Sequence, residues 1–121
     1  MKHLINWIEI PVSDMKRATV FYSTILGLEL SPMQMGPVSY AIFPSGDQFN
    51  AGALAAGEHY TPSSDGVILY LDGGKDLNNI LSKVNVAGGQ VILEKTFLAK
   101  EAGYIGLFID TEGNRIGIQN M

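Results

Sequence analysis

The stretch from Trp7 to Leu26, WIEIPVSDMKRATVFYSTIL, constrains the fold more than any other part of the chain. It predicts a strand, a sharp break and an amphipathic helix in immediate succession. A weaker copy of the same order, GVILYLDGGKDLNNILSKV, runs from Gly66 to Val84. Because 121 residues are one domain by size, the repeat indicates two copies of one unit. A functional site is then expected between the copies.

The first strand alternates between two faces. Its even-numbered residues from 4 to 12 are mostly aliphatic and are predicted to pack beneath the helix. The odd-numbered residues, among them Trp7 and Glu9, lie on the opposite face. Ser13 or Asp14 can cap the start of the helix, and Gly27 is expected to end it in the left-handed conformation.

Three short strands are predicted after this helix, at Leu28–Pro32, Val38–Phe43 and Phe49–Ala55. The polar, turn-rich run GEHYTPSSDG follows. We therefore place module one at about residues 1–57, a linker at about 58–65 and module two at about 66–121.

Module two is predicted to repeat the order of module one. Val67–Leu71 is apolar throughout, as in a strand buried on both faces. A helix, a short strand and a hairpin are expected next, at Leu77–Val84, Gln90–Leu93 and Tyr104–Gln119. The predicted fold class is thus α+β, with two βαβββ modules whose uncovered sheet faces curl around a shared cavity.

Composition excludes several classes of function. The chain has no cysteine, so it has no thiolate metal site, cysteine nucleophile or disulfide. Its net charge is −4 and its eight basic residues are scattered, which argues against nucleic acid as a partner. The first apolar run reaches Glu9 and Pro11 too soon for a secretory signal or a membrane span. We expect no membrane partner and a cytoplasmic location.

Two motifs give the chain a family resemblance. In VSDMKRATVFYSTILGLEL, Asp14 is followed by Phe21-Tyr22 and Leu26-Gly27, and this stretch resembles the first-module signature of the vicinal oxygen chelate superfamily. That superfamily includes glyoxalase I, bleomycin-resistance proteins, fosfomycin-resistance proteins and extradiol dioxygenases. The ending GLFIDTEGNRIGIQ resembles its second-module close. The resemblance implies the two-module fold and a homodimer, but not one particular activity.

The superfamily's usual chemistry depends on a divalent metal bound by His, Glu or Gln at four cavity-facing strand positions. Distance from the motifs puts these positions at Trp7, Ala53 (or Gly52 in the other register), Val67 and Gly117. None of these side chains can ligate such a cation. We therefore predict no metal and no cofactor, which removes the usual basis for glyoxalase I or dioxygenase activity. His3 and His59 are interpreted as surface residues.

Glu9 and Trp7 are the central candidates for a site. Desolvation beside the indole is expected to raise the pKa of Glu9, which would suit an acid, a base or a receptor for a cationic or hydroxylated ligand. Alternatively, Glu9 pairs with Arg115, a lysine or a backbone amide. Trp7 either fills the space of the missing metal or stacks on a ligand.

The remaining candidates form the walls of the expected cavity. Ala53 and Gly117 would leave room, and Lys100, in a loop predicted at Thr96–Gly103, is either solvated or near an anionic ligand. The predicted ligand-binding residues are Trp7, Glu9, Tyr40, Ala53, Val67, Leu69, Leu107, Gly117 and Gln119. An aromatic floor with apolar walls suits a small organic molecule.

Three hypotheses for function follow. The first is metal-independent binding of a small organic molecule, as in bleomycin-resistance-like proteins. The second is a metal-free lyase or isomerase with Glu9 as acid or base, which would need a group to stabilise the oxyanion. The third is an interaction module whose cavity is filled by its own side chains.

Overall fold

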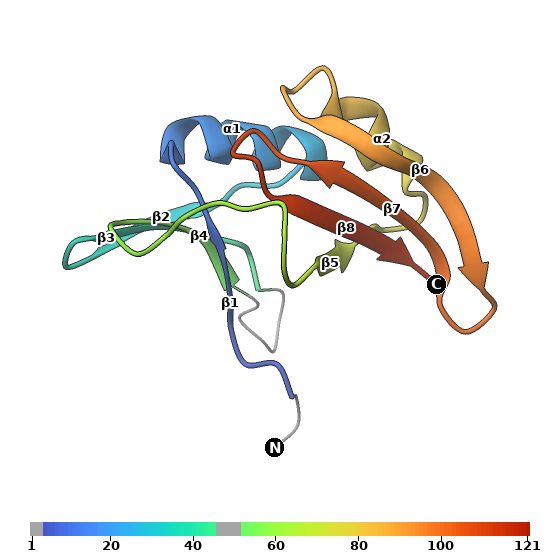
Figure 1. Ribbon diagram of the computed structural model, residues 1–121, viewed down its shortest axis with the longest axis horizontal. Helices are drawn as coiled ribbons and strands as arrows, with labels where there is room; N and C mark the ends of the chain where they lie inside the picture. The colour runs from blue at the N-terminus through green and yellow to red at the C-terminus, as the bar shows by residue number, and fades with distance from the viewer. Residues whose placement is uncertain (1–3, 46–51) are drawn as a thin grey trace.

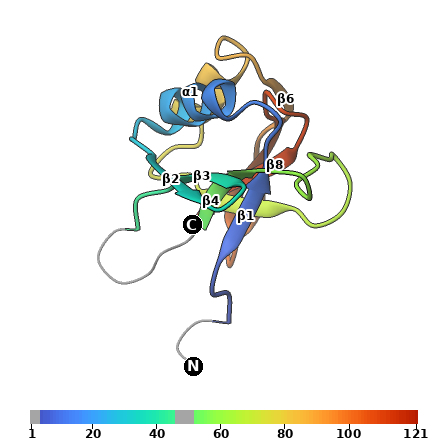
Figure 2. The ribbon, with the colours of Figure 1, turned by 90° about the vertical axis from the view of Figure 1, so that its left-hand side faces the viewer.

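The computed structural model describes residues 4–45 and 52–121. Two sheets lie side by side, and one helix from each module lies on the same side of them, so that the other sheet faces are uncovered (Figures 1 and 2). None of the helices in these two ranges is long and apolar enough to cross a membrane.

The two modules have the same topology. Module one consists of β1 (Ile8–Pro11), α1 (Met15–Leu26), β2 (Ser31–Met35), β3 (Val38–Ile42) and β4 (Gly52–Ala56). Module two consists of β5 (Leu69–Asp72), α2 (Asn78–Val84), β6 (Gln90–Ala99), β7 (Gly103–Ile109) and β8 (Arg115–Asn120). The strand orders are β1-β4-β3-β2 and β5-β8-β7-β6, with the first pair of each sheet parallel. This confirms the predicted α+β class with two βαβββ modules.

A single hydrophobic core lies between the sheets and the helices. The even-numbered Ile10 of β1 and Val12, which follows the strand, are buried, and this confirms the predicted helix-facing side. Phe21 of α1 packs against Phe108 of β7, with ring centroids 5.8 Å apart. The core therefore continues from one module into the other.

The ends of α1 are as predicted. The Asp14 carboxylate accepts a hydrogen bond from the backbone N–H of Arg17 at 3.0 Å, as an N-cap does. Gly27 has a φ of 65° and its N–H donates to the Ser23 carbonyl at 2.9 Å. Only glycine adopts this left-handed geometry readily, so the helix ends there.

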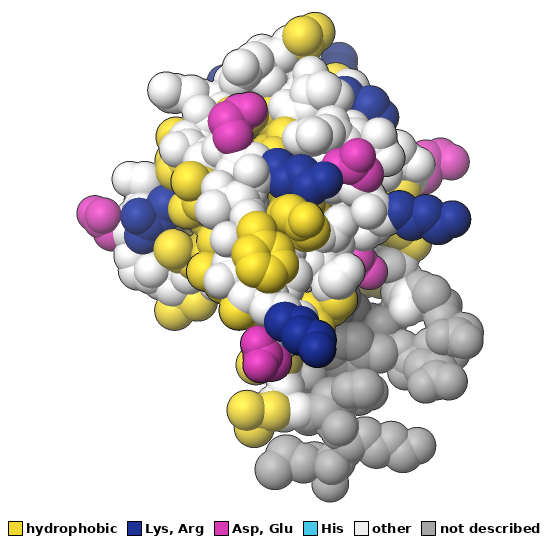
Figure 3. Space-filling model, turned by 90° about the vertical axis from the view of Figure 1, so that its right-hand side faces the viewer, with side chains coloured by type: hydrophobic (Ala, Val, Ile, Leu, Met, Phe, Trp, Pro, Cys, Tyr) yellow, Lys and Arg dark blue, Asp and Glu magenta, His cyan; other side chains and the backbone are white. Residues whose placement is uncertain are grey.

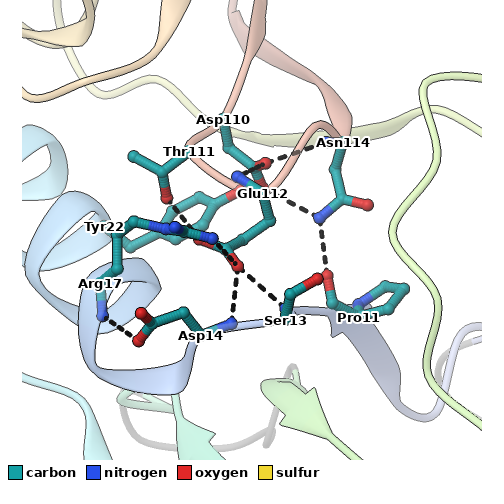
Figure 4. A network of polar contacts seen from close by, with 9 residues as sticks. All are labelled: Pro11, Ser13, Asp14, Arg17, Tyr22, Asp110, Thr111, Glu112 and Asn114. Carbon is teal, nitrogen blue, oxygen red and sulfur yellow. Dashed lines mark hydrogen bonds and ion pairs between the residues drawn. The ribbon is translucent and has the colours of Figure 1, made fainter.

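A buried carboxylate joins the β7–β8 turn to α1 (Figure 4). Asp110 is 3% exposed and accepts hydrogen bonds from the Tyr22 hydroxyl at 2.5 Å and the Asn114 side-chain amide at 3.0 Å. The backbone N–H groups of Glu112 and Asn114 also donate to it, at 2.8 and 2.9 Å. Burial, and then the Asp110 charge, raise the pKa of Tyr22 well above its ordinary value, so the hydroxyl stays a donor.

The next acidic residue makes a second connection. The side chain of Glu112 is fully buried and accepts from the backbone N–H groups of Ser13 and Asp14, at 2.9 and 2.8 Å. It also pairs with the Arg17 guanidinium at 2.8 Å (Figure 4). Burial acts to raise the pKa of Glu112, but these donors outweigh it and lower the pKa to about 2. We refer to the whole set as the polar network: Arg17, Tyr22, Asp110, Glu112 and Asn114.

Several predicted boundaries are wrong. β2 begins at Ser31, three residues after the predicted start. β6 extends from Gln90 to Ala99, because the pairing with β7 continues through bulges that the residue pattern does not reveal. Thr96 to Ala99 is therefore strand, and only Lys100 to Ala102 is turn. The start of the predicted Phe49–Ala55 strand lies outside the described residues.

The first strand of module two is also shorter than predicted. Val67 precedes β5 and is 96% exposed, and Tyr70 within it is 40% exposed. β5 is an edge strand, hydrogen-bonded only to β8 within the described sheet, and Tyr70 on its second face stays partly exposed. The apolar run is thus not a strand buried on both faces.

Candidate ligand-binding site

Four side chains meet on the uncovered face of the first sheet, and we call them the aromatic–acidic cluster: Trp7, Glu9, Tyr40 and Tyr60. The Glu9 carboxylate accepts from the Trp7 indole N–H at 3.1 Å and from the Tyr60 hydroxyl at 2.6 Å. Strand register brings Glu9 and Tyr40 to the same face of the sheet. Glu9 pairs with Ala53 on β4, and Tyr40 pairs with Ala55 on the same face.

The protonation of Glu9 differs from the prediction. Partial burial does favour a higher pKa, but the hydrogen bonds from Tyr60 and Trp7, with a smaller contribution from the nearby Tyr40 hydroxyl, outweigh burial, and the pKa of Glu9 lies below its ordinary value. The predicted rise is therefore wrong. Glu9 is a carboxylate at neutral pH, held among three aromatic rings.

Tyr60 is the residue that sequence reasoning missed. It lies in the segment that connects the modules, which was interpreted only as a polar linker. The hydrogen bond to Glu9, followed by contact with Tyr40, raises the pKa of Tyr60 above its ordinary value, so it remains a donor. The signal available in the sequence was that Tyr60 is the one phenol side chain within GEHYTPSSDG.

Glu9 borders a small pocket of about 220 Å³ at the junction of the modules. Val67, Leu69 and Arg115 also line this pocket. One wall is held by Asn114, whose side-chain amide donates to the Pro11 carbonyl at 2.7 Å. The polar network therefore fixes the end of β1 beside the site.

The other predicted residues are distributed over both faces of the second sheet. Leu107 pairs with Gly117, so both share the uncovered face, and Gln119 joins them there. Leu69 pairs with Ile116 of the core and faces the helix side, because Tyr70, not Leu69, is the neighbour of Gly117. Val67 lies before β5 and is exposed, so the sheet register does not place it.

The small residues do not open a cavity. Ala53 is fully buried. A Cβ at Gly117 would lie 2.5 Å from the ring of Tyr70, so that ring occupies the space expected to be free. Gln119 uses its amide to donate to the Ala102 carbonyl at 2.8 Å. Within one chain, the site is therefore concentrated at the aromatic–acidic cluster.

The superfamily's metal does not fit the residues at the corresponding positions. The Trp7 indole N–H is a donor and is used by Glu9. In residues 4–45 and 52–121, no three His, Cys, Asp or Glu side chains lie close enough to hold a metal ion. His59 is exposed in the connecting segment, and His3 lies outside the described residues.

Comparison with known proteins shows what this arrangement resembles. Residues 5–46 match the family model described as bleomycin resistance protein-like N-terminal. A glyoxalase/bleomycin resistance protein from Albidiferax ferrireducens T118 superposes with a TM-score of 0.70 at 18% identity, over 98% of this chain and 100% of that chain. The chain has the vicinal oxygen chelate fold.

Two further structures with this fold illustrate its range. A glyoxalase/bleomycin resistance protein/dioxygenase family enzyme from Burkholderia phytofirmans PsJN has a TM-score of 0.64 at 15% identity, covering 96% of this chain and 97% of that one. The E144Q glyoxalase I mutant of Zea mays has a TM-score of 0.71 at 17% identity, covering 94% of this chain but 45% of that one. No curated protein sequence matches the chain. The superfamily resemblance expected from the two motifs is confirmed, and at these identities the vicinal oxygen chelate fold leaves the activity open.

Proposed function

We propose that this protein binds a small organic cation, without a metal, at the aromatic–acidic cluster. The observation that supports the proposal most directly is the ionised Glu9 carboxylate held among Trp7, Tyr40 and Tyr60. Aromatic faces attract organic cations through their quadrupole. A carboxylate that accepts two hydrogen bonds also keeps acceptor capacity for a ligand.

Access and charge are consistent with this role. Trp7 is 39% exposed, so a ligand can approach its ring. The net charge of the chain is −4, which favours the approach of cations over anions at this surface. The ligand class is thus a modest organic molecule with a positive group and an apolar portion.

The alternative of a metal-free lyase or isomerase is less well supported. A general base is most effective when its pKa lies near the working pH. Glu9 has a lowered pKa and is correspondingly a weak base. The third hypothesis is an interaction module with a filled cavity. The observation in its favour is that the ring of Tyr70 packs over Gly117.

A matched pair of probes tests the binding proposal. Choline and its uncharged isostere 3,3-dimethylbutan-1-ol would be titrated against the wild type by calorimetry, beside a thermal-shift screen of metabolites and antibiotics. Choline is expected to bind about 10-fold more tightly than the isostere, and Glu9→Gln to remove that difference. Glu58→Gln, at a 90% exposed side chain, is the control and should change nothing. Equal binding of the two probes, or an unchanged preference in Glu9→Gln, would contradict the proposal.

We also propose that the protein is a homodimer formed through the uncovered sheet faces. These faces expose large apolar side chains, including Met35 and Tyr70, which are 60% and 40% exposed. Met35 pairs with Val38 on β3 and therefore shares its face with Tyr40. A second chain against this face would enclose the aromatic–acidic cluster.

Light scattering of two variants tests the dimer. Met35→Asp is expected to reduce the measured mass from two chains to one, because a charge would be desolvated in the interface. Val20→Asp is matched in exposure, at 60%, but lies on α1, away from this face. It should leave the mass unchanged. A monomeric wild type, or a dimeric Met35→Asp variant, would argue against the interface.

A further inference from the structure

A pocket larger than the one beside Glu9 lies on the helix side of the sheets, and none of the four aromatic–acidic cluster side chains lines it. It measures about 530 Å³, and we call it the inter-module pocket. Segments of both modules contribute to it: the end of α1, the residues that follow β3, β5 and α2. Its apolar walls include Ile25, Leu28, Phe43, Leu69, Leu71 and Ile80.

The charges at this pocket differ from those of the chain as a whole. Lys75 and Lys83 line it, and Asp72 is the acidic side chain in its lining. Asp72 accepts a hydrogen bond from the Gly74 N–H at 2.9 Å. In the described part of the chain, the basic side chains within ion-pair distance of a carboxylate are Arg17, His59 and Lys95. Lys75 and Lys83 are not among them. Two ammonium groups thus border an apolar pocket on a chain whose net charge is −4.

We propose that the inter-module pocket binds an apolar monocarboxylate, such as a medium-chain fatty acid. The aliphatic and aromatic walls would take the hydrocarbon portion, since removal of apolar surface from water is favourable. Lys75 and Lys83 would pair with the carboxylate at the edge; their flexible stems allow an ammonium group to follow an anion as a point charge. The volume is in the range of pockets that bury small organic ligands.

This site is separate from the proposed cation site. Ile8, which lines the inter-module pocket, and Glu9, which belongs to the cluster, are consecutive residues of β1 and point to opposite faces. A ligand in the inter-module pocket would contact α1 and the segment after β3 in module one, together with β5 and α2 of module two. Because it would bind only the folded chain, it would stabilise the docking of the two modules.

Octanoate and 1-octanol, which have equal chain lengths, distinguish charge recognition from simple apolar binding. The wild type is expected to bind octanoate at least about 10-fold more tightly than 1-octanol by calorimetry. The Lys75→Met/Lys83→Met double variant should lose that preference and keep its affinity for 1-octanol. Higher salt concentration should weaken octanoate binding to the wild type.

Two controls make the outcome specific. Lys16→Met/Lys100→Met removes two exposed lysines outside the pocket and should preserve the preference for octanoate. Glu9→Gln should preserve it as well, which separates failure of this site from failure of the proposed function. The proposal is overturned if octanoate does not bind at millimolar concentration, if 1-octanol binds equally well, or if the Lys75→Met/Lys83→Met variant keeps the preference while its thermal unfolding remains cooperative.

Discussion

Replacement of Asp110 by alanine is expected to lower the free energy of unfolding by about 3–5 kcal/mol, because several hydrogen bonds to one buried carboxylate, each contributing roughly 1.5–3 kcal/mol, are lost together without being additive. The carboxylate is 3% exposed and accepts from Tyr22, from Glu112 and twice from Asn114. Alanine would leave these donors without their acceptor in a site that water does not reach. The midpoint of thermal unfolding should fall by roughly 10–20 °C.

Asp65→Ala is the matched control for this variant. Asp65 is an exposed carboxylate in the connecting segment, so its removal should change stability by less than about 0.5 kcal/mol. Circular dichroism at 222 nm during heating would measure both variants. An Asp110→Ala protein that unfolds within 3 °C of the wild type would show that the β7–β8 turn does not depend on this carboxylate.

Glu112→Gln is expected to reduce stability at neutral pH by about 2–3 kcal/mol, and this difference should disappear in acid. The pKa of Glu112 is about 2 in the folded protein, against an ordinary value of 4.5, and each unit of such a shift corresponds to about 1.4 kcal/mol. The expected loss of stability is set below the full value of this shift because the Arg17 side chain is half exposed, and solvent screens its ion pair with Glu112.

The direction of the pH effect follows from proton binding. Below pH 4.5 the unfolded chain protonates Glu112 while the folded chain still holds it as a carboxylate. The stabilisation is therefore complete above about pH 5 and is lost as the pH falls from 4.5 toward 2. Urea unfolding of the wild type and Glu112→Gln at pH 7 and pH 2.5 would show the difference shrinking. Glu29→Gln, at an exposed residue, should show a small difference that stays constant; a constant difference for Glu112→Gln would contradict the assignment.

The sequence predicted the fold well because its signals are local. The Asp14 cap, the apolar stripe of α1 and the left-handed Gly27 are each written within a few residues, and all three are confirmed. The βαβββ order and its repeat follow from such signals in succession. Errors occurred where pairing across strands decides the outcome, as in the extension of β6 to Ala99 and the exposure of Val67.

The site was predictable only in part, for the same reason. Alternation along one strand correctly placed Trp7 and Glu9 on a common face. It offered no way to place Tyr60, which lies 51 residues from Glu9 in sequence and reaches it from the connecting segment. The pKa of Glu9 was mispredicted because these hydrogen-bond partners were not recognised in the sequence. Burial alone would raise this pKa, whereas the hydroxyl and indole donors lower it.

The sequence alone determined the order of strand and helix between Trp7 and Leu26, and also the later copy of this pair, since periodicity and caps act over short distances. The residues at the superfamily's metal positions were equally readable, because ligation depends on side-chain chemistry. The tertiary structure alone decided that Glu9 is ionised, that Tyr70 fills the space above Gly117, and that two lysines border the inter-module pocket. Each of these features depends on contacts between segments that are far apart along the chain, and no local residue pattern in the sequence reveals which segments meet.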